Sequence, residues 1–229
     1  MSGTLCLIPA RGGSKRLPRK NVLPLAGKPL LSYTIAAARE SGCFDEIVVS
    51  SDDDEILALA SQASVTADRR PPQLAGDRVR FVEVLEEFLL RASNAHYEHI
   101  AVLLPTCPFR TADDLRAAFT LYREYSGFVI GVTEYEFPPQ FALHLGGDGH
   151  SLAMQRPEIY HTSTQSQSVP KSYHPNGSLY LGSTARFLAK KTFFAEPLHA
   201  YVMPPERSLD IDYPHQFAMA ESLILTQRP

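Results

Sequence analysis

The chain has 229 residues, 44% of them hydrophobic and 21% charged, a composition typical of folded globular proteins that excludes a disordered or fibrous chain. Its 22 Lys and Arg residues are outnumbered by 25 Asp and Glu residues, and the net charge of −3 argues against a general nucleic-acid or anionic-membrane binder. The sequence has no apolar run of the ~18–20 residues that span a bilayer, no basic signal-peptide start and no CxxC pair among its three cysteines. We therefore expect a soluble, cytoplasmic protein.

The first two-thirds of the chain alternates short β-rich runs with longer helical patterns, which predicts βαβ units and a mainly parallel sheet. The expected strands cover residues 4–8, 46–50, 100–104, 128–133 and 178–181. The expected helices cover residues 30–41, 78–92, 111–125 and 214–225, and one more is capped by Asp52. Gly42 should close the first helix, and Thr111 with Asp114 forms a capping box. His96 and His99 lie in a polar stretch that we interpret as a surface loop.

Regular patterns stop between Glu134 and Pro175, where proline and glycine pairs and a polar run separate short alternating pieces. We interpret this span as an insertion off the main sheet, either a lid or an oligomerisation arm. The sequence thus predicts one α/β domain over residues 1–229, with a mainly parallel sheet, helices on both faces and one excursion.

The loop after the first strand is the most informative segment. Six cations and no carboxylate lie between Arg11 and Lys28, in a protein that is net acidic. Gly12 and Gly13 allow the backbone to approach a ligand and to present successive N–H groups to it. Open α/β sheets bind ligands at the carboxyl ends of their strands, where this loop begins. The pattern favours a polyphosphate site over a merely solvated basic loop, and it is neither a Walker A nor a GxGxxG motif.

A second motif, Asp210-Ile211-Asp212, predicts a cation site. Residues two apart in an extended chain face the same way, so both carboxylates can meet one ion. Mg²⁺ takes one or two protein carboxylates together with substrate phosphates. The alternative is a polar turn that caps the helix beginning near Pro214.

Together these motifs resemble the acylneuraminate cytidylyltransferases, which are the CMP-sialic acid synthetases and their bacterial legionaminic and pseudaminic acid relatives. The matching stretches, in the expected order, are residues 7–16, 18–21, 27–30, 47–52, 70–71, 74–77, 105–110, 174–180, 193–194 and 208–212. The resemblance implies a Rossmann-like fold and transfer of CMP from CTP to the anomeric hydroxyl of a nine-carbon α-keto acid sugar, with release of pyrophosphate.

The resemblance also implies roles for individual residues. The implied CTP ligands are Arg11, Gly12, Gly13, Ser14, Lys20, Asn21, Arg70 and Asp77. Lys20, with Arg11, would stabilise the charge on the transferring phosphate. Asp210 and Asp212 would hold Mg²⁺, and Asp212 is a candidate for helping to deprotonate the sugar hydroxyl. The implied sugar-side residues are Leu104, Gln140, His174, Tyr180, Phe193 and Phe194.

Four positions depart from typical sialic acid synthetases and leave the sugar open among sialic, legionaminic and pseudaminic acids. Leu104 stands where those enzymes have Gln, Gln140 where they have Lys, His174 where they have Arg, and Phe81 where they have Ser. Each change removes a polar or charged group from a recognition site, and such sites discriminate strongly between sugars.

The span 134–173 corresponds to the family's dimerisation arm, which implies a homodimer with Gln140, and with it Lys171, near the other subunit's pocket. Two alternatives remain open. One is a nucleotidyltransferase for another acid sugar, such as 3-deoxy-manno-octulosonate, or for a neutral sugar phosphate. The other is a catalytically silent nucleotide-binding module, which would bind CTP without releasing pyrophosphate.

Overall fold

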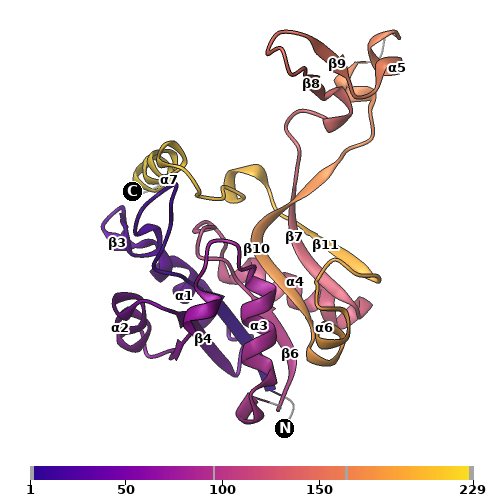
Figure 1. Ribbon diagram of the computed structural model, residues 1–229. Coiled ribbons are helices and arrows are strands. Elements are labelled where there is room, and N and C mark those ends of the chain that lie inside the picture. The colour runs from indigo at the N-terminus through magenta and orange to yellow at the C-terminus, as the bar shows by residue number, and fades with distance from the viewer. Residues whose placement is uncertain (1–2, 95, 163–164, 227–229) are drawn as a thin grey trace. The chain divides into compact units, whose positions relative to one another are not determined.

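The computed structural model describes residues 3–94, 96–162 and 165–226 (Figure 1). These form two compact units, the larger made of residues 1–132 and 175–229 and the smaller of Thr133–His174. Within the described residues, none of the helices has the length and apolar character that crossing a membrane requires.

A seven-stranded sheet organises the larger unit. Its strands are β1 (Gly3–Pro9), β4 (Glu46–Ser51), β5 (Thr66–Arg69), β6 (Tyr97–Val102), β7 (Phe128–Glu134), β10 (Tyr173–Ser183) and β11 (Leu198–Val202). Their order is β11-β7-β10-β6-β1-β4-β5. The pairs β1–β4, β1–β6, β4–β5 and β7–β11 are parallel, whereas β10 runs antiparallel to β6. The predicted mainly parallel α/β sheet is therefore confirmed.

Helices cover both faces of the sheet because alternate residues of each buried strand point to opposite sides. Cys6 and Ile8 of β1 contribute to the core beneath α1 (Leu30–Ser41), α2 (Asp54–Gln62) and α4 (Ala112–Tyr125). Leu5 and Leu7 contribute to the core beneath α3 (Phe81–Leu90) and α6 (Thr184–Lys190). A third cluster packs the last helix, α7 (Pro214–Thr226), near the short hairpin of β2 (Pro24–Leu25) and β3 (Lys28–Pro29).

The helix ends confirm two of the predicted caps and correct a third. Gly42 closes α1 with φ 64°, a conformation that glycine adopts without strain, and Thr111 and Asp114 form the capping box of α4. The N-cap of α2 is Asp53, not Asp52, because the helix begins one residue later and Asp53 accepts the N–H groups of Glu55 and Ile56. Asp52 instead accepts a hydrogen bond from the N–H of Gly12.

The sequence patterns missed β5, β11 and α6. The two strands lie at the edges of the sheet, where exposed polar side chains blur the apolar signal of a strand. Strand β6 also begins at Tyr97 rather than at residue 100, so His99 lies inside a strand and not in a surface loop as predicted. Short 3-10 turns occur at Lys20–Val22, Pro72–Leu74, Ala92–Asn94, Pro139–Phe141, Ser166–Ser168 and Pro205–Arg207.

The smaller unit contains an antiparallel hairpin of β8 (Leu143–Leu145) and β9 (Leu152–Met154), followed by α5 (Pro157–Tyr160). Phe141 packs edge-on against Tyr160, with ring centroids 5.6 Å apart. Gln140 donates its amide to the Ser172 hydroxyl at 2.9 Å, and Lys171 pairs with Glu134 at 2.7 Å. The hairpin exposes four large apolar side chains: Leu143, Leu145, Leu152 and Met154. That this unit is a dimerisation arm stays a prediction.

Candidate active site

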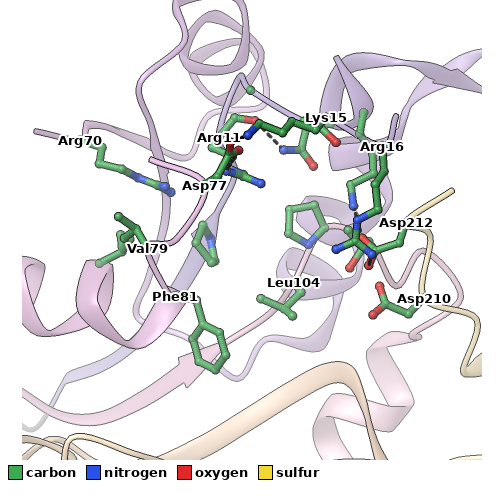
Figure 2. A pocket seen from close by; sticks show the side chains of 18 residues that line it. Arg11, Lys15, Arg16, Arg70, Asp77, Val79, Phe81, Leu104, Asp210 and Asp212 are labelled. Carbon is green, nitrogen blue, oxygen red and sulfur yellow. Dashed lines mark hydrogen bonds and ion pairs between the residues drawn. The ribbon is translucent and has the colours of Figure 1, made fainter. Parts of the chain in front are cut away.

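A cavity of about 450 Å³ lies at the carboxyl ends of the central strands (Figure 2). Its floor includes Pro9, at the end of β1, and residues 104–106, which follow β6. The basic glycine loop borders it, together with residues Arg70 and Asp77 and the Asp210–Asp212 motif. The two motifs that the sequence predicted as phosphate and metal sites thus face the same cavity.

Residues at the start of α2 hold the glycine loop in place through hydrogen bonds and ion pairs. The Gly12 N–H donates to Asp52 Oδ1 at 3.0 Å, and a Cβ atom at position 12 would lie only 2.6 Å from Asp53 Oδ2. Arg19, in the left-handed region with φ 59°, pairs with both Asp53 and Glu55. The hydrogen bonds from Arg19 hold the pKa of Asp53 below its usual value. Glycine at position 12 is therefore required by packing against Asp53.

The hydrogen bond to Asp52 concerns one of the predicted CTP ligands, Gly12. The Gly12 amide is committed to Asp52, which leaves the Gly13 amide and the Ser14 side chain at the cavity. The run of acidic residues at 52–55 was visible in the sequence, but only the fold shows that it faces the loop. Asp52 and Asp53 were missed as site residues for that reason.

Cations of the loop contact carboxylates on both sides of the cavity. Arg11 and Lys15 lie 2.7 and 2.6 Å from the two oxygens of Asp77. On the other side, Lys20 Nζ lies 2.7 Å from Asp212 Oδ1 and donates to the Ile211 carbonyl at 2.8 Å. The side chain of Lys20 is only 11% exposed, so its charge is directed at the cavity rather than at bulk water. Arg16 pairs with the second oxygen of Asp212 at 2.9 Å.

The two carboxylates of the Asp210–Asp212 motif differ in environment. Asp210 is mostly buried, burial raises its pKa, and its Oδ1 has no hydrogen-bond partner among the described residues. Partial burial acts in the same direction on Asp212, but the hydrogen bond from Lys20 and the charges of Lys20 and Arg16 leave its pKa below the usual value. A buried carboxylate oxygen without a donor is costly unless a cation meets it.

These residues fit a magnesium ion. Within the described part of the chain, no group of three or more His, Cys, Asp and Glu side chains forms a protein-only metal cage. Two carboxylates beside a cavity lined by cations match the way in which Mg²⁺ is shared between a protein and a polyphosphate.

Two further predicted nucleotide residues lie at the same cavity. Asn21 is buried and donates its amide to the Arg11 carbonyl at 2.9 Å, which braces the loop. Arg70 is 5% exposed, and burial lowers its pKa. Arg70 donates to the Ser50 carbonyl at 2.7 Å, so its guanidinium joins the ends of β4 and β5 beside the cavity.

The wall opposite the cations is apolar. Leu104, Phe81 and Val79 form it, as Figure 2 shows. The ring of Phe81 lies 4.7 Å from that of Tyr180 and 6.2 Å from that of Phe193, measured between centroids. Phe81, one of the four positions that depart from the sialic acid synthetases, thus lies in the wall of the cavity.

Three predicted sugar-side residues of the larger unit, Tyr180, Phe193 and Phe194, do not line this cavity. Tyr180 and Phe193 are buried in the core, and Phe194 is 53% exposed on the surface. Gln140 and His174 belong to the smaller unit, where the ring of His174 packs on that of Tyr135. Leu104 is the predicted sugar-side residue of the larger unit that faces the cavity, and the sugar-side roles of Gln140 and His174 stay predictions.

Comparison with known proteins identifies the family. The model of the family described as "Cytidylyltransferase" matches residues 5–223. The chain belongs to the cytidylyltransferase family. It is 36% identical to the pseudaminic acid cytidylyltransferase of Campylobacter jejuni serotype O:2, over 91% of this chain and 90% of that protein. It is 35% identical to the N-acylneuraminate cytidylyltransferase of Escherichia coli O18:K1:H7, over 94% of this chain and 51% of that protein.

The structural comparison agrees with the family at the level of the fold. The cytidylyltransferase superposes on a CMP:2-keto-3-deoxy-manno-octonic acid synthetase complexed with CTP, with a TM-score of 0.71, 14% identity and coverage of 99% of this chain and 100% of that one. The Rossmann-like architecture that the resemblance implied is thus confirmed.

Proposed function

We propose that the protein transfers CMP from CTP to the anomeric hydroxyl of a nonulosonic acid and releases pyrophosphate. The observation that carries the proposal is that the basic glycine loop and the Asp210–Asp212 pair border one cavity, joined by the 2.7 Å contact between Lys20 and Asp212. The relatives named for pseudaminic and N-acylneuraminic acids support the acceptor class.

The reaction forms a bond between the sugar oxygen and the α-phosphorus as the bond to the pyrophosphate oxygen breaks, and the hydroxyl loses its proton. Catalysis of such a step depends on positioning and charge neutralisation. Arg11, Lys15 and Lys20 exchange their carboxylate partners for phosphate oxygens, and the Gly13 amide and Ser14 hydroxyl add donors. Lys20 has the least exposed side chain of these three cations. We therefore assign to Lys20 the role of stabilising the negative charge that develops on the transferring phosphate.

Asp210 and Asp212 would hold Mg²⁺, which supplies positive charge to the phosphates when it is bound. We expect turnover to vanish with EDTA and to return with Mg²⁺. Asp210→Asn should raise the Mg²⁺ concentration for half-maximal rate by about 10- to 100-fold, the loss caused by weakening a metal site. A rate that is unchanged in EDTA would contradict the assignment, and Asp148→Asn, in the smaller unit, is the matched control.

For the acceptor, the apolar wall of Leu104, Phe81 and Val79 favours a sugar that presents few hydroxyls on that side, because a buried hydroxyl without a partner is penalised. Leu104→Gln should therefore shift the ratio of kcat/KM values toward the more hydroxylated acid. An unchanged ratio would remove Leu104 from the sugar site.

The deciding experiment is pyrophosphate release with Mg²⁺ and each of CTP, ATP, GTP and UTP, against a panel of sialic, legionaminic, pseudaminic and 3-deoxy-manno-octulosonic acids. Turnover with CTP and one nine-carbon acid supports the proposal and names the sugar. Turnover with only the octulosonic acid would move the protein to another acceptor class. CTP binding without pyrophosphate release would favour the silent module.

We also propose that the protein is a cytoplasmic homodimer, because its nucleotide substrate is a cytoplasmic metabolite and the β8–β9 hairpin exposes an apolar surface that a second copy would cover. Leu145→Lys should convert a dimer to a monomer in light scattering. Leu90→Lys, at an equally exposed leucine of α3, should leave the dimer intact. A wild-type monomer with full activity would contradict the dimer.

A further inference from the structure

A second cavity, of about 480 Å³, lies at the opposite end of the strands from the active site. Thr4 and His99, which are paired at the beginning of β1 and β6, line it together with Ser183 at the end of β10. The C-terminal part of α4 and the first turn of α6 complete the wall. All of these residues belong to the larger unit.

Two arginines line this cavity, the exposed Arg123 and the half-buried Arg186, and neither has a carboxylate partner among the described residues. Arg123 comes from α4 and Arg186 from α6, and within the described residues neither guanidinium makes an ion pair or a side-chain hydrogen bond. Arg116, on the same helix as Arg123, by contrast contacts the carboxylate of Asp113. Asp45 accepts the N–H of Thr4, in the cavity wall, at 2.7 Å.

Other side chains beside the arginines add hydrogen-bonding capacity and an apolar surface. The hydroxyl of Tyr122 and Nδ1 of His99 lie 2.9 Å apart, and the ring of Tyr122 packs edge-on against that of Phe119. The positive charge of Arg186 acts on Tyr122, whose pKa burial nevertheless raises. The phenol therefore stays protonated and able to donate or accept at neutral pH.

We propose that this cavity binds a small organic anion that carries a phosphate or a carboxylate beside an apolar body. Arginine presents a fork of donors that matches both anions, and two forks with no internal carboxylate leave their donors available to a ligand. The aromatic rings of Phe119 and Tyr122 would contact the apolar part. The nucleotidyl-transfer reaction uses none of these residues, so the proposed site does not depend on the proposed function.

The test is isothermal titration of the wild-type protein with phenyl phosphate and with benzoate, in saturating CTP without acceptor, so that the first cavity is occupied. Saturable binding of phenyl phosphate alone would identify a phosphate ester as the ligand class, and saturable binding of benzoate alone a carboxylate. Arg123→Gln/Arg186→Gln should weaken that binding at least about tenfold, the effect of losing one charge-assisted hydrogen bond. Arg80→Gln, at the exposed arginine that precedes α3, should leave it unchanged.

The double variant should keep wild-type turnover and thermal stability, because its side chains lie outside the active site. If it does not fold, Arg123→Lys and Arg186→Lys separately keep the charge, lose the fork, and should each weaken binding. Absence of saturable binding by either probe, or equal affinity in the wild type and the double variant, would overturn the proposal.

Discussion

The two cavities lie at opposite ends of one sheet, and they differ in whether carboxylates pair with their cations. In the active-site cavity, each of Arg11, Lys15, Arg16 and Lys20 contacts Asp77 or Asp212. In the second cavity, Arg123 and Arg186 contact no carboxylate within the described part of the chain. A loop with this density of cations repels itself unless carboxylates neutralise it in the empty protein. Phosphate binding at the first cavity is thus an exchange of partners, whereas at the second it adds a partner.

The basic loop keeps its shape through contacts on the side that faces away from the cavity. Arg19 points away from the cavity to the acidic start of α2, and the Gly12 amide is bound there by Asp52. One side of the loop is thus anchored permanently, while its cavity side carries exchangeable ion pairs.

The largest effect is expected at Lys20. Lys20→Gln removes a cavity cation whose side chain is only 11% exposed, and loss of one preorganised donor costs about 10²- to 10³-fold in kcat. Lys28→Gln, at an exposed residue of the β2–β3 hairpin, should retain wild-type kcat. Steady-state rates of pyrophosphate release measure both. A kcat for Lys20→Gln within threefold of the wild type would show that the exchangeable pairs carry no catalytic charge.

An intermediate effect is expected on the anchored side. Gly12→Ala places a methyl group against Asp53, and overpacking of this kind costs about 1–3 kcal/mol of unfolding free energy. Gly13→Ala is the matched control because no atom lies within 4 Å of its Cβ position. Urea unfolding of the two variants should differ accordingly. Equal stabilities would mean that the loop is not clamped at position 12.

The smallest effect is expected at Asp77. Asp77→Asn frees Arg11 and Lys15 in the empty protein, so CTP no longer displaces an ion pair and binds more tightly. Asp77 and its two partners are exposed to solvent, and exposed ion pairs contribute little, so the gain in affinity should be small, about fivefold. Asp113→Asn, at an exposed residue of α4, should bind CTP like the wild type. Weaker CTP binding by Asp77→Asn would instead make Asp77 a positioning residue.

Local patterns in the sequence were enough to predict the strand–loop–helix start, the parallel sheet and the two motifs that meet at the cavity, because each depends on residues adjacent in the chain. The clamp by Asp52 and Asp53, the place of Phe81 in the wall, and the contact between His99 and Tyr122 depend on segments brought together by folding. Tyr180 and Phe193 are the opposite case, because the sequence predicted them at the site and the fold buries them. Their residue types suit a sugar site, but the packing of the larger unit buries them beneath Phe81.

The central claim is that the cavity joins CMP to an acid sugar. ³¹P nuclear magnetic resonance of one reaction mixture, with CTP, Mg²⁺ and the best acceptor of the panel, tests it most directly. The account predicts that the triphosphate signals are replaced, in equal amounts, by those of a phosphodiester and of pyrophosphate, and that the Lys20→Gln protein leaves CTP intact. Free CMP with pyrophosphate and no phosphodiester, or unchanged CTP with the wild-type protein, would contradict it.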